Sequence, residues 1–175
     1  MRVACLLDNG FEDSEFRRPY DALRQAGHEV TVIGLRRGDE LSGYKGDQVI
    51  RADSGLEEVS PDAFDALLIP GGYSPDHLRA DERAVEFTRA FFVKERPVFA
   101  VCHGPQLLLS ADVVKGRRMT AWPTVQGDLR KAGSNVVDEE TVIDRRLLTS
   151  RKPDDLDAFC REAVGMLQGA SVGSG

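Results

Sequence analysis

The chain alternates short apolar runs with longer segments in which apolar residues recur at helical spacing. The apolar runs have the length and continuity of strands that lie buried on both faces of a parallel sheet. We predict such strands at residues 3–7, 29–35, 66–69 and 98–101. Helices are predicted between and after them, at residues 12–26, 80–94, 104–111, 124–132 and 153–167.

Two regions depart from this alternation. Residues 41–52 carry Gly43, Gly46 and short alternating runs, which indicates a hairpin or β-arm rather than a helix. The second region follows the helix predicted at residues 104–111 and contains several short strands, predicted around Met119 and at residues 136–137, 141–143 and 147–149.

One domain accounts for nearly the whole chain, because 175 residues is the size of a single α/β domain. The alternation predicts a doubly wound sandwich over residues 1–168 with a mostly parallel central sheet. In such a fold the ligand site lies at the carboxyl ends of the strands. The small, polar tail at residues 169–175 is predicted to be disordered.

Charge and cysteine content exclude several classes of function. The formal net charge is −6, so we expect no nucleic-acid or membrane partner, since both attract a basic face. The three cysteines, Cys5, Cys102 and Cys160, are an odd number and far apart, unlike a disulfide framework or a zinc site. With no apolar segment long enough for a signal peptide or a membrane span, the expected location is the cytoplasm.

Cofactor motifs are absent from the sequence. No glycine-rich nucleotide loop follows a predicted strand, and the three histidines stand at spacings that do not suit a metal site. We therefore expect neither a cofactor nor a metal ion.

The strongest chemical signal is a cysteine placed between a strand and a helix. Residues 98–101 lead directly into Cys102, and Gly104 and Pro105 then turn the chain into a helix. This order is similar to a nucleophile elbow, in which a sharp turn lifts one side chain above the sheet. The helix N-terminus favours a thiolate there, and backbone N–H groups in the turn would hold an oxyanion. A free cysteine here would also fit as a small buried hydrophobic residue that ends the strand. We favour the catalytic interpretation, with Cys102 beside His103.

Two glutamates follow the first strand. Glu12 and Glu15 are three residues apart and share a face at the start of the predicted helix. A carboxyl group beside a thiolate shifts towards its protonated form and donates a hydrogen bond to the sulfur. The simpler interpretation is that both acids cap the helix and complement its dipole. The spacing alone favours the simpler interpretation and does not choose between the two residues.

A glycine pair, Gly71 and Gly72, follows the third predicted strand. Adjacent glycines permit backbone angles that point an N–H group into the crevice at the strand ends. A simple loop would carry the same pair, so this motif is weak evidence by itself.

Three motifs in order resemble the ThiJ/PfpI superfamily, most closely its PfpI-type intracellular protease and deglycase branch. They are GFEDSE after the first strand, FDALLIPGGYSPDHLR in the middle, and VFAVCHGPQLLLSA at the elbow, followed by VVKGRRMTAW. The resemblance continues through VIDRRLLTSRKPDDL and covers nearly the whole chain. It implies a flavodoxin-like α/β sandwich, similar to class I glutamine amidotransferases.

The resemblance also implies roles for individual residues. Cys102 would be the nucleophile, with His103 as its neighbour. Glu15 would be the carboxylic partner of the thiol, and Glu12 is the second candidate because it would face the same pocket. The backbone N–H groups of Gly72 and His103 would form the oxyanion site.

The same resemblance implies a site completed by assembly. In PfpI-type proteases an acid from the adjacent subunit completes a Cys-His-acid triad, and the matching residue here is Asp76, one methylene shorter than the usual glutamate. Gly71, Tyr73 and Trp122 would line the pocket. A homodimer or a higher homo-oligomer is therefore expected.

Three functions share the need for a reactive thiol in a small pocket. We favour a stress-response enzyme that acts on glyoxal-type aldehydes or their early glycation adducts, with a small carbonyl compound or a glycated protein or peptide as its partner. One alternative is a PfpI-like cysteine protease with a Cys-His-Asp site shared between subunits. The other is a non-enzymatic redox sensor in which Cys102 is oxidised.

Overall fold

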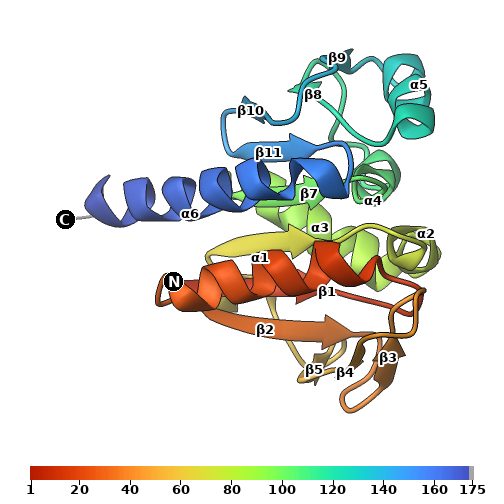
Figure 1. The fold of residues 1–175 in the computed structure, drawn as a ribbon, viewed down its shortest axis with the longest axis vertical. Coiled ribbons are helices and arrows are strands. Elements are labelled where there is room, and N and C mark those ends of the chain that lie inside the picture. Colours follow the sequence, from red (N-terminus) through yellow and green to blue (C-terminus); the bar gives the residue numbers. More distant parts are fainter. Residues whose placement is uncertain (174–175) are drawn as a thin grey trace.

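A computed structural model describes residues 1–173, with side chains as far as residue 169, and shows an α/β sandwich of three layers (Figure 1). The central sheet has seven strands in the order β10-β11-β7-β6-β1-β2-β5. All neighbouring strands run parallel except β10 and β11, which form an antiparallel hairpin at one edge. The strands of this sheet are β1 (Arg2–Leu6), β2 (Glu29–Gly34), β5 (Ser54–Gly55), β6 (Ala66–Ile69), β7 (Val98–Val101), β10 (Val142–Asp144) and β11 (Leu147–Ser150).

Helices cover both faces of this sheet. Helices α1 and α6 pack side by side on one face, and α3 and α4 pack on the other (Figure 1). The helices are α1 (Asp13–Gln25), α2 (Ser74–Leu78), α3 (Glu82–Val93), α4 (Pro105–Ser110), α5 (Pro123–Lys131) and α6 (Leu156–Gly173), with short 3-10 turns at Pro61–Ala63 and Pro153–Asp155. The predicted doubly wound sandwich is confirmed.

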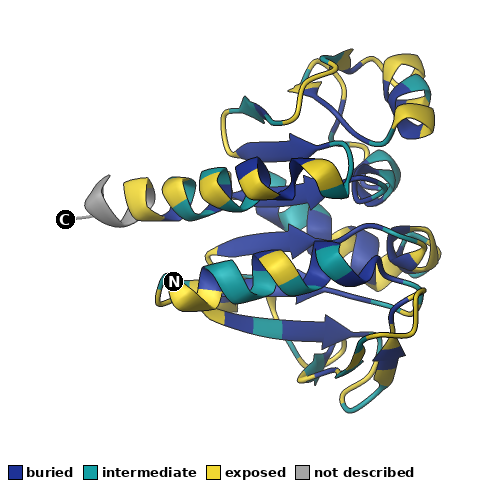
Figure 2. Ribbon diagram, in the orientation of Figure 1, coloured by how far each residue is buried: buried dark blue, intermediate teal, exposed yellow. Residues whose placement is uncertain are grey.

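The apolar runs form the centre of the molecule, and Figure 2 shows β1, β6 and β7 buried between the helices. Alternate side chains of each strand enter two separate cores, because successive residues of a strand point to opposite faces. Phe16 and Phe159 bring α1 and α6 into one core, and Phe87 and Leu107 bring α3 and α4 into the other. This double burial fixes the ends of the central strands, where the site lies.

The predicted β-arm at residues 41–52 is also confirmed. Strands β3 (Glu40–Ser42) and β4 (Val49–Arg51) form an antiparallel pair. A further pair, β8 (Arg118–Met119) and β9 (Asn135–Val136), is parallel and separate from the main sheet. The β3–β4 arm folds over the carboxyl ends of the strands, where Tyr44 N donates to Phe11 O at 2.9 Å.

Two details differ from the sequence prediction. Helix α2 follows Tyr73 where only a loop was expected, and its five residues are too few to show helical periodicity. Helix α6 continues to Gly173, so residues 169–173 of the predicted disordered tail are helical, because extending an existing helix needs no new nucleation. Residues 174–175 of that tail lie outside the described residues. None of the described helices combines the length and apolar character needed to cross a membrane.

Candidate active site

Cys102 occupies a strained turn directly after β7. Its φ is +62°, a left-handed conformation that residues other than glycine seldom adopt. Backbone hydrogen bonds hold it on two sides, with Cys102 N donating to Ser150 O and Trp122 N donating to Cys102 O, both at 2.9 Å. Strain of this kind persists where the surrounding structure fixes the residue, and it is common at reactive sites.

Gly104 makes this turn possible. A Cβ atom at Gly104 would lie 2.7 Å from the backbone oxygen of Ile69 and 3.0 Å from that of Val101, so only glycine fits against these strands. Pro105 then begins α4, where its missing N–H costs no hydrogen bond. The strand-cysteine-turn-helix order predicted from the sequence is therefore present.

The Cys102 thiol is nearly enclosed, with 4% of the residue exposed. Its sulfur lies 3.3 Å from His103 Nδ1 and accepts a hydrogen bond from the His103 backbone N–H. The Glu15 carboxyl group lies beside it, with Oε2 buried and without a hydrogen-bond partner in the described residues, and its negative charge acts on the thiol pKa. One sulfur thus meets an imidazole, an amide and a carboxyl group.

Glu15 is completely buried, on the first turn of α1. Its Oε1 accepts a hydrogen bond from Gly71 N at 3.0 Å. Burial, together with the negative charge of Glu12, raises the pKa of Glu15 to about 8. At neutral pH the carboxyl group is therefore protonated. Of the two glutamates left open by the sequence, Glu15 is the one that contacts Cys102.

The environment of the thiol differs from the simple helix-terminus expectation. Burial, followed by the negative charge of Glu15, raises the pKa of the Cys102 thiol rather than lowering it. The second contribution disappears when Glu15 is protonated, and the carboxyl proton then stabilises a thiolate by hydrogen bonding. At neutral pH both groups therefore hold a proton, and the pair begins to ionise as pH rises through about 8.

Glu12 has a separate role at the start of α1. Its Oε2 accepts hydrogen bonds from Glu15 N at 2.9 Å and from the Ser14 hydroxyl, and its Oε1 pairs with Lys45 Nζ at 3.1 Å. Although burial opposes the shift, these contacts lower the pKa of Glu12. Glu12 is thus an ionised helix cap beside a protonated Glu15, and Lys45 from the β3–β4 arm neutralises it.

The thiol opens into a cavity of about 360 Å³ at the carboxyl ends of the strands. The His103 ring stacks on Trp122 with centroids 5.7 Å apart, and Tyr44 meets Tyr73 edge-on at 6.1 Å. Tyr73 is 65% exposed and Tyr44 51% exposed, so these rings stand at the mouth. The cavity is lined by Glu12, Glu15, Tyr44, Gly72, Tyr73, Cys102, His103, Trp122 and Pro153.

The glycine pair shapes the same cavity. Gly72 has φ +77°, and a Cβ atom there would lie 2.4 Å from Glu12 N and 2.5 Å from Gly10 O. Gly71 has room for no side chain either, since its Cβ would lie 2.3 Å from Glu15 Oε1. Gly71 does not line the cavity and instead holds Glu15 through its N–H.

Asp76 is the predicted residue that stands apart. It lies on α2 outside the cavity, its side chain is 65% exposed, and Oδ1 is 3.9 Å from Arg79 Nη1. Burial lowers the pKa of His103, while the negative charge of Asp76 opposes that shift. Asp76 therefore influences His103 within one chain without contacting it.

Sequence reasoning missed Tyr44, Lys45 and Pro153. Tyr44 and Pro153 line the cavity and Lys45 pairs with Glu12, yet none of them belongs to a motif that signals chemistry. The glycine-bounded β-arm was the one available signal for Tyr44 and Lys45. Within the described residues, no three histidine, cysteine or acidic side chains gather as a group that would hold a metal ion.

A comparison with protein families matches residues 1–166 to the model of the DJ-1/PfpI family. The chain belongs to the DJ-1/PfpI family. The resemblance seen in the three sequence motifs is therefore confirmed.

Individual relatives cover the same length. The chain is 51% identical over 167 residues to "Protein/nucleic acid deglycase 2" of Escherichia coli, covering 95% of this chain and 97% of the relative. It is 46% identical to "General stress protein 18" of Bacillus subtilis, covering 95% and 98%. Among solved structures, a two-domain protein from Anabaena variabilis with DJ-1/ThiJ/PfpI-like and ferritin-like domains matches with a TM-score of 0.93 at 37% identity, over 95% of this chain and 48% of that one.

Proposed function

We propose that this chain is a stress-response enzyme that uses Cys102 to act on glyoxal-type aldehydes or on the early glycation adducts they form. The observation that carries the proposal is the buried Cys102–Glu15 pair, in which a carboxyl group of raised pKa lies beside the thiol at the end of a cavity. The deglycase and general stress protein among its DJ-1/PfpI relatives support the same reading. The cytoplasmic location and the homo-oligomer stay predictions from the sequence.

The first step is addition of sulfur to the carbonyl carbon. The Cys102 thiolate forms the C–S bond, and the carbonyl oxygen becomes an oxyanion that takes a proton from Glu15 to give a hemithioacetal. The N–H of Gly72 lines the same cavity and donates to no acceptor in the described part of the chain, so it is available to this oxygen. The proposed oxyanion site therefore needs no rearrangement of the backbone.

The second step redistributes protons on the substrate. Glu15, now ionised, accepts the proton from the carbon bonded to sulfur, and the adjacent ketone carbon receives a proton in return. The hemithioacetal of methylglyoxal thereby isomerises to a lactoyl thioester without any external oxidant. Water then cleaves the C–S bond, releases lactate and restores the thiol. For a glycation adduct, the C–S bond forms as the C–N bond breaks, the amine leaves with a proton from Glu15, and the resulting hemithioacetal isomerises in the same way.

The test is methylglyoxal consumption and lactate formation by the wild type and Cys102→Ala. The wild type is expected to form lactate, and Cys102→Ala is expected to lose at least about a thousandfold in kcat/KM because no C–S bond forms. Cys5→Ala serves as the matched control, since Cys5 is buried in β1 away from the cavity. Full lactate formation by Cys102→Ala would contradict the proposal.

A cysteine protease is the second candidate, and the contact between His103 Nδ1 and the Cys102 sulfur favours it. A protease would need an acidic side chain beside His103 to complete a Cys-His-acid triad, and the proposed acid is Asp76 of an adjacent subunit. Cleavage of a fluorescent peptide that is lost in Asp76→Ala, without lactate formation, would place the protease first. A protein silent in both assays, whose Cys102 is oxidised selectively by dilute peroxide, would be a redox sensor instead.

A further inference from the structure

A second cavity lies at the opposite end of β7 from Cys102. Its volume is about 250 Å³, and it lies where the residues that precede β7, β8 and β11 meet the end of α3. Four of its lining residues are arginines and one is acidic: Arg96, Arg117, Arg145, Arg146 and Glu95. The chain as a whole carries a net charge of −6, so this cavity concentrates positive charge on an acidic protein.

Arg117 is fixed in place by contacts that leave its outer nitrogens available. Its Nε donates to Val113 O at 2.8 Å, and its guanidinium lies over the Phe92 ring, 4.8 Å from the centroid. No carboxylate forms an ion pair with Arg117 anywhere in residues 1–169. A guanidinium held at its inner edge presents its outer N–H groups to the cavity as a preformed fork.

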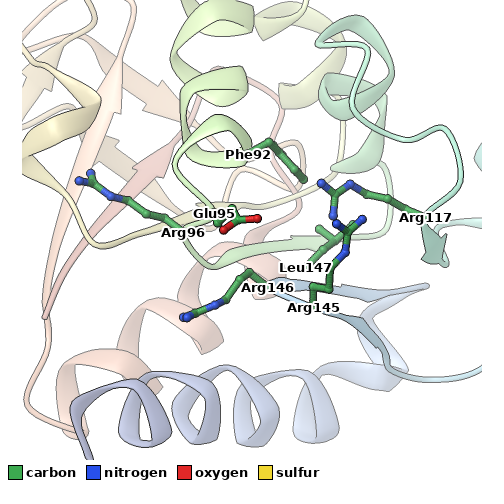
Figure 3. Close-up of a pocket in the computed structure, with 7 residues that line it drawn as sticks. All are labelled: Phe92, Glu95, Arg96, Arg117, Arg145, Arg146 and Leu147. Atoms are coloured by element: carbon green, nitrogen blue, oxygen red, sulfur yellow. The ribbon is translucent and has the colours of Figure 1, made fainter. Parts of the chain in front are cut away.

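Arg145 brings a second guanidinium to the same place. Figure 3 shows the Arg117 and Arg145 side chains converging, while the Glu95 carboxylate points towards them from the α3 side. Burial, and next the charge of Arg145, lowers the pKa of Arg117, which reports the repulsion between the two cations. Asp144 only partly offsets this charge, since its Oδ1 is 3.6 Å from Arg145 Nε. An anion between the two guanidinium groups would relieve the repulsion.

The backbone is strained at two of the lining residues. Arg145 has φ +56° in the turn between β10 and β11, and Glu95 has φ +54° after α3. Glycine would adopt these angles at less cost. Arg145 and Glu95 occupy them with about 1 kcal/mol of strain each. Cys102 shows the same feature in the other cavity.

The other two arginines, Arg96 and Arg146, add positive charge to the cavity but do not reach the proposed ligand. Arg96 Nη1 donates to Pro61 O at 2.8 Å and to Phe64 O at 2.6 Å, and Figure 3 shows its head group turned away from Arg117. The Arg146 head group also points away from Arg117. The position at which a ligand would bind therefore lies between Arg117 and Arg145.

We propose that this cavity binds a small anion through its phosphate group, held between the guanidinium forks of Arg117 and Arg145. Paired arginines bind phosphate oxygens two at a time, with a geometry that lysine does not offer. Phe92 and Leu147 give the cavity an apolar wall, which favours a phosphate ester with a short organic group over free phosphate. A small ligand fits better than a nucleic acid, because the acidic remainder of the chain repels a long polyanion.

Isothermal titration calorimetry with inorganic phosphate and phenyl phosphate, at low ionic strength, tests the site. Both probes are expected to bind the wild type. Arg145→Ala is expected to weaken binding about tenfold or more, by removing one charge-assisted fork. Glu95→Gln is expected to tighten binding, because it removes the acid that faces the ligand. Arg51→Ala, an exposed arginine on β4 near the other edge of the sheet, is the charge-matched control and should bind like the wild type.

The comparison separates a built site from general charge attraction. Equal losses in Arg145→Ala and Arg51→Ala, or no loss in Arg145→Ala, would overturn the proposal. Thermal unfolding of each variant checks that the fold is intact, and Arg145 is preferred to Arg117 because its exposed turn position makes no packing contact with Phe92. Tighter binding of phenyl phosphate identifies an ester as the ligand, and equal binding identifies phosphate itself.

Discussion

At the scale of single residues, the site contains a buried glutamate, Glu15, whose burial costs the fold stability as pH rises. The pKa of Glu15 is raised to about 8 in the fold, above its value in the unfolded chain. Between these two values the folded chain holds a proton that the unfolded chain has released, so stability is lost as pH rises towards 8.

Glu15→Gln should therefore stabilise the protein more at high pH than at low pH. The amide has the same shape and never ionises, so the variant avoids the cost of a buried carboxylate. We expect its melting temperature to exceed that of the wild type by about 3 °C or more at pH 9, and by much less at pH 5. Differential scanning calorimetry at the two pH values measures this. A difference independent of pH would show that Glu15 does not titrate as argued.

The position of Cys102 in a strand-to-helix turn could be predicted from the sequence, but the pKa of its thiol could not. The run of apolar residues before Cys102 and the Gly104-Pro105 turn after it are local signals. The burial that raises the thiol pKa comes from α1 and from the segment around Trp122, which the chain brings together only in three dimensions. Glu12 and Glu15 were indistinguishable by spacing, because their difference is one of burial and neighbours.

At the scale of elements, the β3–β4 arm places a cation beside the two glutamates at the start of α1. Lys45 pairs with Glu12, and its positive charge also lowers the pKa of Glu15. Lys45→Met should therefore raise the pH at which methylglyoxal turnover rises, by roughly half a unit because Lys45 is exposed and screened by salt. Lys131→Met, on the exposed end of α5, is the control and should leave the profile unchanged. A downward shift in Lys45→Met would contradict this role for the arm.

The elbow between β7 and α4 gives a second prediction at this scale. A Cβ atom at Gly104 meets backbone oxygens of β6 and β7, which cannot move without disturbing the sheet. We expect Gly104→Ala to lower the melting temperature by about 3–10 °C, the effect of roughly 1–3 kcal/mol of overpacking. Gly127→Ala in α5 is the matched control, because its Cβ meets nothing within 4 Å and helix propensity predicts a small gain. Equal melting temperatures for the two variants would show that the turn tolerates a side chain.

At the scale of the whole molecule, the strand-helix alternation was enough to predict the sandwich, because each strand of the centre is a local apolar run. Helix α2 was missed, since five residues beginning Ser74-Pro75 carry no periodic pattern. The arginine cavity was missed for a different reason. Its members come from three separate segments, and surface arginines in a sequence predict only solvent exposure.

The two cavities divide the molecule into two ends with different chemistry. The carboxyl ends of the strands hold a buried acid and a thiol, and the residues that precede β7 and β11 hold arginines. The function proposed for the carboxyl ends of the strands depends on Glu15, which is proposed to supply and accept the proton that the Cys102 chemistry needs.

The most direct test of this claim is the rate of lactate formation from methylglyoxal between pH 5 and 10, for the wild type and Glu15→Gln. We predict that wild-type kcat/KM rises as pH rises through about 8, where the Cys102–Glu15 pair loses its first proton and a thiolate beside a protonated carboxyl group can form. Glu15→Gln should be slower by about a hundredfold or more and should lack the rise near pH 8. A Glu15→Gln enzyme with the wild-type rate and the wild-type pH profile would contradict the account.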